Sequence, residues 1–375
     1  MSAHPPRRIA FPLLAFTGLL ALPAAQSQAS APALRLNQIQ VIGSHNSYHV
    51  EAPQSEAGPI SVVGGAATQG LQYSHAPLDQ QFAGQRVRQI ELDVYADPKG
   101  GQYAKPPIRI VTGQKAEYDP AMDKPGTKVL HIAGLDYHST CVSLVACLRT
   151  VKKWSDANPS HVPIAILLEF KDTLEIPLKG LPPIPLLTWT RERMLGLEQE
   201  IRSVLPNEDL LTPDTVRSPG KTLEQTVLTD GWPTLDSARG KVMFLMDPNA
   251  TQRAQYLQGN PSLEGRVIFT SAEPGQPDAA FVERNNPTAA DLPALVAKGY
   301  LVRTRADSDT AEARSGSTTA RDAALASGAQ WVSTDYPVPG LAARFGTGYH
   351  TSLPGFATAR CNPVSAPAPC SALAP

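Results

Sequence analysis

The sequence predicts a (β/α)8 barrel formed by a single domain. Eight short apolar runs rich in Val, Ile and Leu recur along the chain, with longer helical or loop segments between them. Continuous apolar runs are typical of parallel strands buried on both faces, and parallel strands need long crossover connections. The length of 375 residues, of which 42% are hydrophobic, fits a barrel of this type.

The expected strands are spread over the whole chain after its first segment. They cover residues 39–43, 87–94, 128–132, 164–170, 242–246, 266–269, 300–303 and 330–333.

Two connecting helices are predicted most clearly. Ser139 and Thr140 can cap a helix over residues 141–154, whose apolar residues form one stripe. An alanine-rich helix is expected over residues 311–327, before Gly328. Two other regions, residues 51–70 and 100–126, are rich in Gly and Pro without a clear period, which predicts long loops over the mouth of the barrel.

The first residues have the pattern of a secretory signal. Arg7 and Arg8 precede an apolar run over residues 9–22, and small residues follow up to Ala29. The apolar run is short for a membrane span. We therefore expect a signal peptide over residues 1–29, a barrel domain over 30–360 and a secreted or periplasmic mature chain.

The four cysteines fit an exported protein. Their spacing gives two short-range pairs, Cys141 with Cys147 and Cys361 with Cys370, and neither pair has the CxxC spacing of a metal or redox site. Disulfides are therefore expected, although four cysteines permit three pairings. The Pro- and Ala-rich tail over residues 361–375 is expected to be held by its own disulfide.

The charge pattern excludes one class of partner. The formal net charge is −1 at pH 7 and there is no basic block, so nucleic acid is not expected to bind. We expect a monomer with no transmembrane span in the mature chain.

Polar side chains gather where the expected strands end. The carboxyl ends of parallel barrel strands meet at one rim, where catalytic residues of such barrels collect. In chain order these ends carry His45 and Asn46, Glu91 and Asp93, His131, Glu169 and Lys171, Asp247, Arg303 and Arg305, and Asp335.

A metal site is predicted at this rim. Asn46, Glu91, Asp93 and Glu169 form an oxygen-only ligand set, which suits calcium better than zinc. Two histidines, His45 and His131, remain free to act as base and acid near neutral pH. A divalent ion beside two histidines suits phosphodiester cleavage. His138 is an alternative to His131. We prefer His131 because it ends an expected strand.

Five segments at these strand ends carry a family resemblance. The segments GSHNSY, IELDVYAD, HIAGLDYHSTC, ILLEFKD and SGAQWVSTDYP together resemble the catalytic barrel of calcium-dependent phosphatidylinositol-specific phospholipase C, in its compact secreted bacterial form. The resemblance covers nearly the whole mature chain. It implies a phosphodiesterase barrel with Ca2+ as cofactor, His45 and His131 as catalytic histidines, and Asn46, Glu91, Asp93 and Glu169 as calcium ligands.

The resemblance also implies a reaction. The inositol 2-hydroxyl attacks phosphorus and expels diacylglycerol, which gives a cyclic inositol phosphate. We assign deprotonation of the hydroxyl to His45, with a calcium-bound carboxylate as the alternative base, and protonation of the leaving oxygen to His131. Lys171, Arg303, Arg305 and Asp335 either contact the inositol ring or pair with one another, and we weight these two roles equally.

The substrate implied by the resemblance lies in a membrane surface. A long basic insert that would bind extra ring phosphates is not evident, so plain phosphatidylinositol is the expected substrate. The apolar segment over residues 181–189, with Leu187 and Trp189, is the expected contact with the membrane. Asp136 and Ser139 either orient His131 or cap the helix that follows, and we favour capping.

Two other functions fit parts of the pattern. A glycerophosphodiester phosphodiesterase or phospholipase D-like barrel also combines two histidines with a Glu-x-Asp metal pair, but typically has His-Arg-Gly where this chain has His45, Asn46 and Ser47. A non-catalytic lipid-binding barrel is the third possibility, and the intact histidines and ligands count against it.

Overall fold

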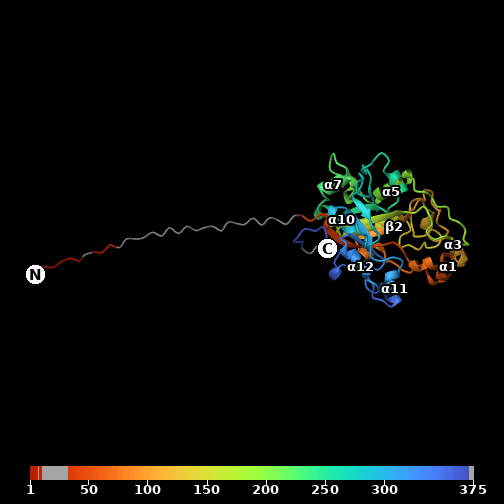
Figure 1. Cartoon of the computed structure of the whole chain (residues 1–375), viewed down its shortest axis with the longest axis horizontal. Coiled ribbons are helices and arrows are strands. Elements are labelled where there is room, and N and C mark those ends of the chain that lie inside the picture. The colour runs from red at the N-terminus through yellow and green to blue at the C-terminus, as the bar shows by residue number, and fades with distance from the viewer. Residues whose placement is uncertain (7, 11–32, 371–375) are drawn as a thin grey trace. The chain divides into compact units, whose positions relative to one another are not determined.

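Eight parallel strands form a nearly closed barrel in the computed structural model, which describes residues 1–6, 8–10 and 33–370 (Figure 1). Most of the predicted signal peptide lies outside the described residues. The barrel strands are β1 (Ile39–Ser44), β2 (Gln89–Tyr95), β4 (Ile164–Phe170), β5 (Val242–Met246), β6 (Ile268–Thr270), β7 (Phe281–Glu283), β8 (Leu301–Arg305) and β9 (Trp331–Thr334).

The strands lie side by side in the order of the chain. β1 pairs in parallel with β9 from Val41↔Trp331 to Ser44↔Thr334, which closes one side of the barrel. β6 and β7 are joined much more weakly, since the single parallel bridge Ser271↔Phe281 pairs the residue after β6 with β7. Every residue of β1, β2 and β5 is buried, as expected for strands covered on both faces.

One of the eight expected strands is wrong. β3 (Lys128–Val129) pairs antiparallel with β2, at Val94↔Val129, and therefore stands outside the parallel barrel. The missing barrel strand is β7, whose three residues are too few to show a period in the sequence. His131 accordingly follows an antiparallel pair and not a barrel strand.

The helices cover the outside of the barrel and parts of its mouth. The longer ones are α1 (Gln54–Gly64), α4 (Leu144–Ala157), α5 (Arg191–Val204), α7 (Leu223–Thr229), α9 (Ala250–Tyr256), α10 (Leu292–Lys298) and α12 (Thr319–Ala326). The shorter α-helices are α2 (Leu78–Ala83), α3 (Pro107–Val111), α6 (Pro213–Val216), α8 (Leu235–Ala238) and α11 (Ala311–Ser315). Short 3-10 turns complete the set: η1 (Leu36–Gln38), η2 (Gly65–Leu71), η3 (Pro120–Asp123), η4 (Asn207–Asp209), η5 (Leu341–Phe345) and η6 (Pro354–Phe356).

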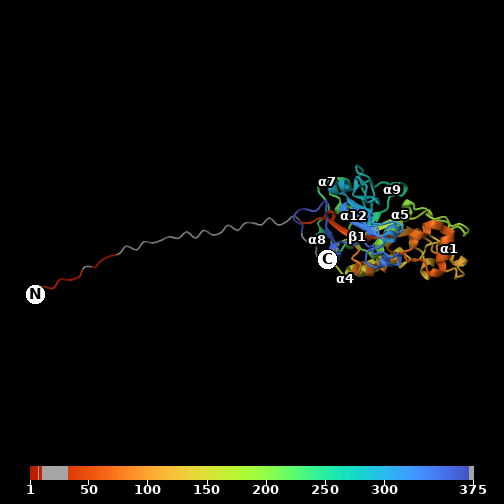
Figure 2. The same cartoon turned by 60° about the horizontal axis from the view of Figure 1, so that its bottom comes forward.

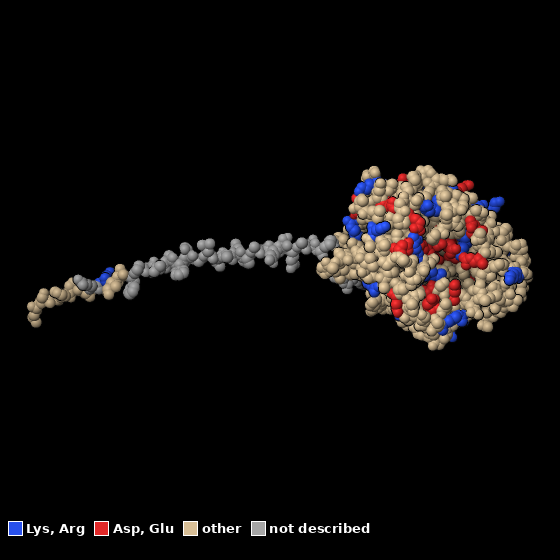
Figure 3. Space-filling model, in the orientation of Figure 1, with Lys and Arg blue, Asp and Glu red and all other residues tan. Residues whose placement is uncertain are grey.

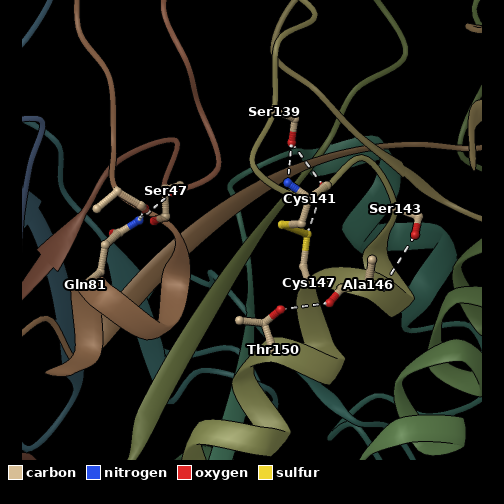
Figure 4. The surroundings of a disulfide bond; sticks show 9 residues. Ser47, Gln81, Ser139, Cys141, Ser143, Ala146, Cys147 and Thr150 are labelled. Carbon is tan, nitrogen blue, oxygen red and sulfur yellow. Dashed lines mark hydrogen bonds between the residues drawn. A yellow bond between two sulfur atoms is a disulfide. The ribbon is translucent and has the colours of Figure 1, made fainter. Parts of the chain in front are cut away.

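The first disulfide spans the amino end of α4 (Figure 4). Cys141 and Cys147 are bonded, and the helix begins after Ser143, whose Oγ accepts a hydrogen bond from the Ala146 amide. The predicted caps, Ser139 and Thr140, were therefore a few residues too early. The disulfide bridges the cap, because one cysteine precedes Ser143 and the other lies in the first turn.

Two segments differ in helical content from what the sequence predicted. The predicted helix over residues 311–327 is two helices, α11 and α12, because Gly316 adopts a φ of 71° and ends the first one. The predicted loop over residues 51–70 is instead mostly helical, in α1 and η2. Local propensity is poor there, with Gly58 and Pro59 inside α1, so tertiary contacts stabilise this helix.

The C-terminal tail is part of the fold. β10 (Arg360–Cys361) pairs antiparallel with the start of β1, and the Asn362 amide donates to the Gln38 carbonyl oxygen. A disulfide joins Cys361 to Cys370, so both predicted cysteine pairs are confirmed. The tail thus covers the amino end of β1, opposite the rim that carries the polar side chains.

The expected membrane contact at Trp189 is wrong. This side chain is 1% exposed, and its Nε1 donates to the carbonyl oxygens of Val94 and Lys171, at 3.2 and 3.1 Å. Leu187 packs against the core at the same place. Among the described residues, no helix combines the length and the apolar character needed to cross a bilayer.

Candidate active site

A cavity of about 430 Å³ opens at the carboxyl ends of the barrel strands. All the residues predicted to form the site line it, apart from Asp93, which is fully buried beneath it. Figure 3 shows acidic side chains gathered in the middle of this face, with basic side chains among them. The barrel topology brings these residues together from strands that are far apart in the sequence.

Three carboxylates form the base of the cavity. Glu91 and Asp93 lie two residues apart on β2, and the register places Asp93 opposite Glu169 on β4. Ligand oxygens of these three residues lie within 4.8 Å of one another, close enough to surround one ion. Carboxylate oxygens in this number are a typical calcium environment.

Asn46 completes the oxygen set from β1. Its backbone is in the left-handed region, with a φ of 44°, which asparagine tolerates better than most residues. The next residue fixes this turn to β2, because Ser47 Oγ accepts a hydrogen bond from the Glu91 amide at 2.8 Å. Asn46 Oδ1 is buried, and no donor in the described part of the chain reaches it. A buried acceptor without a donor is suited to a cation.

Lys171 supplies positive charge to the same carboxylates. Its Nζ lies 3.1 Å from Asp93 Oδ2 and 2.7 Å from Glu169 Oε1, and it also contacts Glu175. Burial raises the pKa of Asp93 and of Glu169, and the lysine opposes that rise in both. One ammonium faces three carboxylates, of which only Asp93 is fully buried, and this excess of carboxylates fits a divalent calcium ion.

His45 is held at the cavity wall by Asp335. Its Nδ1 lies 2.9 Å from Asp335 Oδ1, and its Nε2 lies 3.7 Å from Glu91 Oε1. Burial and the neighbouring Arg305 guanidinium lower the pKa of His45 well below its usual value. The imidazole is therefore neutral at neutral pH. With the proton on Nδ1, Nε2 is the acceptor nitrogen, and Arg305 Nη1 approaches it at 3.3 Å.

His131 has the opposite protonation. Its Nδ1 lies 2.7 Å from Asp136 Oδ2, and its Nε2 lies 3.6 Å from Glu175 Oε2. Burial by itself would lower the pKa of His131, but hydrogen bonds to Asp136 and Glu175 outweigh it and raise the pKa to about 10. The site thus combines a neutral histidine with a protonated one.

Asp136 contacts two histidines. Its Oδ2 also lies 2.8 Å from His49 Nε2. Of the two roles considered for Asp136, the contact with His131 is the one observed, and the favoured role as a helix cap is wrong. The rival histidine, His138, is directed elsewhere, since its Nε2 donates to Glu56 at 2.8 Å and it does not line the cavity.

The other basic residues are engaged by carboxylates. Arg303 is 1% exposed and bonds to Glu91 and to Glu283, the latter at 2.8 Å. Arg305 lies 3.6 Å from Asp335, on the side where it also approaches His45. Structural pairing, one of the two roles considered for these residues, is thus present throughout the set.

Sequence reasoning missed several lining residues. Glu283 and Asn285 belong to β7 and its carboxyl end, and were overlooked because that strand was not recognised. Glu175 lies in the loop after β4, where its spacing of four residues from Lys171 was the available signal. Asp247, which the sequence did place at a strand end, directly follows β5, and burial together with the neighbouring Glu283 raises its pKa well above the usual value.

A nearly closed barrel whose rim carries an oxygen-rich donor set for a cation and two histidines held by aspartates defines the class of metal-dependent phosphodiesterases. The family model described as "Phosphoinositide phospholipase C, Ca2+-dependent" matches residues 34–363. The chain belongs to that family. It is accordingly a phosphoric diester hydrolase of the phospholipase C type, with calcium as its cofactor, which confirms the resemblance found in the sequence.

Solved structures agree with this assignment at the level of the fold. A Ca2+-dependent phosphatidylinositol-specific phospholipase C from Streptomyces antibioticus is 16% identical, with a TM-score of 0.51, and the match covers 81% of this chain and 96% of that one. The calcium-dependent phosphoinositol-specific phospholipase C of a Pseudomonas species, described in an apo form and myoinositol complex, is 17% identical with a TM-score of 0.51. That match covers 88% of this chain and 95% of the other. A search of curated proteins gave no match.

Proposed function

We propose that this protein is exported and cleaves phosphatidylinositol to diacylglycerol and a cyclic inositol phosphate. The observation that carries the proposal is the cluster of three carboxylates beside two cavity-lining histidines, His45 and His131, each of which is hydrogen-bonded to a buried aspartate. Export is supported by the two disulfides, which persist in oxidising compartments.

The residues divide the reaction between them. Asn46, Glu91, Asp93 and Glu169 would hold calcium, which lowers the pKa of a bound hydroxyl and neutralises charge on the phosphate. His45 Nε2 removes the proton of the inositol 2-hydroxyl, whose oxygen forms the new bond to phosphorus. His131 donates its proton to the glycerol oxygen as the bond from that oxygen to phosphorus breaks. Asp335 and Asp136 hold the two rings in place.

Product analysis tests this proposal directly. Purified protein is incubated with phosphatidylinositol vesicles, with calcium or with a chelator, and the products are separated. We expect diacylglycerol and cyclic inositol phosphate with calcium, and neither with the chelator. Phosphatidic acid as the product, or release of glycerophosphate from deacylated lipid with no action on the intact lipid, would support one of the alternative barrel enzymes instead.

The charge of the cavity predicts its headgroup selectivity. Lys171, Arg303 and Arg305 are all paired with carboxylates, and further acids line the wall, so no unpaired cation in the described lining is available for a ring phosphate. Like charges brought together cost several kcal/mol. We expect phosphatidylinositol 4,5-bisphosphate to be cleaved at least ~10-fold more slowly than phosphatidylinositol at equal surface concentration.

A conservative variant checks the cause of this selectivity. Asp309 lies at the exposed edge of the lining with a φ of 51°, a conformation that asparagine also tolerates. Asp309→Asn should therefore raise the cleavage rate on the bisphosphate relative to the rate on phosphatidylinositol, with little change in the latter. A wild-type enzyme that prefers the bisphosphate would contradict the charge argument.

Asp136→Asn should change the pH dependence of the reaction. The carboxylate contributes to raising the pKa of His131 to about 10, so its loss lowers that pKa toward the ordinary value of about 6.5. The acid form of His131 is then lost at lower pH, and the alkaline limb of kcat moves to lower pH. A profile that keeps its alkaline limb while kcat falls uniformly would indicate that Asp136 has only a structural role.

A further inference from the structure

One part of the cavity rim is almost free of charge. Residues 52–73, which include α1 and η2, contain a single charged side chain, Glu56, whereas charged residues make up 18% of the whole chain. Glu56 is fully buried and therefore adds no charge to the surface. The exposed residues of this segment are Pro, Gln, Ser, Val, Ala and Gly, so water has no ionic group to solvate there.

The same region displays exposed apolar side chains. Val62 on α1 is 85% exposed, and Ile110 and Val111 on α3 are 61% and 56% exposed. Within residues 33–370 these are the three most exposed large hydrophobic side chains. We call the exposed surface of α1, η2 and α3 the neutral lip. In Figure 3 the side on which Figure 1 places α1 and α3 carries little red or blue.

The neutral lip is continuous with the active site. η2 follows α1 without a break, and its residues Ala67, Gly70 and Leu71 line the cavity. The lip also lies on the rim side of the barrel, since α1 follows β1 and α3 follows β2. A lipid whose headgroup occupies the cavity therefore has this surface beside its glycerol and acyl chains.

Buried contacts hold the lip in a fixed position. Ile60 and Val63 of α1 share an apolar cluster with Ile108 of α3. Glu56 accepts hydrogen bonds from Tyr137 Oη at 2.6 Å and from His138 Nε2 at 2.8 Å.

These anchoring residues belong to the loop that carries His131 and Asp136. The charged residue of α3, Arg109, is fixed in the same network by donating to Tyr137 Oη at 3.0 Å. Docking through the lip would thus place the second histidine at a defined height above the bound surface.

We propose that the neutral lip docks on the lipid surface and inserts Val62, Ile110 and Val111 into it. The inference rests on the proposed function only in that the substrate is a membrane lipid. The lip carries one partly exposed charged side chain, Arg109, and its attraction to lipid comes mainly from burial of hydrocarbon, which salt does not screen. The enzyme therefore binds neutral lipid and does not need an anionic headgroup for docking.

Vesicle binding tests the lip separately from catalysis. The full chain is sedimented with phosphatidylcholine vesicles that contain no phosphatidylinositol, at about 0.05 and 0.5 M salt. We expect binding at both salt concentrations, and a decrease of at least ~10-fold in the partition coefficient of Val62→Asp and of Ile110→Asp/Val111→Asp. The matched control is Leu228→Asp on α7, which Figures 1 and 2 place at the opposite end of the barrel and which is 42% exposed.

A second measurement separates docking from folding and from the reaction. The lip variants should keep the wild-type rate on a soluble short-chain phosphatidylinositol and lose activity on vesicles. Wild-type protein that fails to bind, variants that bind normally, or an equal loss in Leu228→Asp would overturn the docking surface. Lip-dependent binding by a protein that cleaves neither substrate would overturn the proposed function and leave the docking surface in place.

Discussion

His45→Ala should lower kcat on phosphatidylinositol by roughly 10²–10⁴-fold, the usual contribution of one general acid or base. Burial and Arg305 lower the pKa of His45, which keeps the imidazole neutral, and Asp335 at 2.9 Å orients it. These two conditions suit His45 to act as the base. The measurement is the initial rate on mixed micelles at saturating calcium. KM should change much less than kcat, because His45 acts on the proton and not on the headgroup.

His161→Ala is the matched control for this variant. His161 is also buried, but it bonds to Ser155 Oγ at 2.8 Å and lies before β4, at the amino end of the barrel. It should lose stability and keep its kcat per folded molecule. A loss of less than about tenfold in His45→Ala would assign the base to a calcium-bound carboxylate instead.

Asp93→Asn should raise the calcium concentration needed for half-maximal activity by roughly 10²-fold, since one full charge is removed beside the ion. Asp93 is fully buried, and its carboxylate lies within 4.8 Å of ligand oxygens of Glu91 and Glu169. A second measurement does not depend on turnover. Calcium stabilises a folded protein that binds it, so the calcium-induced rise in melting temperature should shrink in this variant.

Asp97→Asn controls for the loss of any buried acid. Asp97 is 3% exposed and pairs with Lys128 at 3.0 Å, outside the lining of the cavity. This variant should melt at a lower temperature and respond to calcium as the wild type does. An unchanged calcium response in Asp93→Asn would remove Asp93 from the ligand set.

The sequence predicted the barrel well where strands are long and buried. β2 and β4 are seven residues each and wholly or almost wholly buried, so their apolar runs are unambiguous. β7 has three residues, and β3 has an apolar run that pairs antiparallel. The length of a strand and the direction in which it pairs depend on the strands beside it, and a short run of residues does not identify those strands.

The helix α1 at the mouth of the barrel was also predicted wrongly, because contacts distant in the sequence stabilise it. α1 contains Gly58 and Pro59 and has no clear amphipathic period, so the sequence predicted a loop. It is stabilised by Glu56, which is hydrogen-bonded to Tyr137 and His138, and by Ile60 and Val63, which lie in an apolar cluster. The membrane contact was misplaced for a related reason, since Trp189 is apolar in sequence but covered in the fold.

The sequence by itself determined which chemistry the protein can perform. Asn46, Glu91, Asp93, Glu169 and the two histidines stand at or near strand ends, and the barrel brings such ends to one rim by its topology alone. The tertiary structure decided how each group is used. Asp335 meets His45 across 290 residues of chain, and Asp136, expected to be a cap, turns back to His131. Protonation depends on burial and on charges nearby in space, and these are set only when the whole barrel has closed.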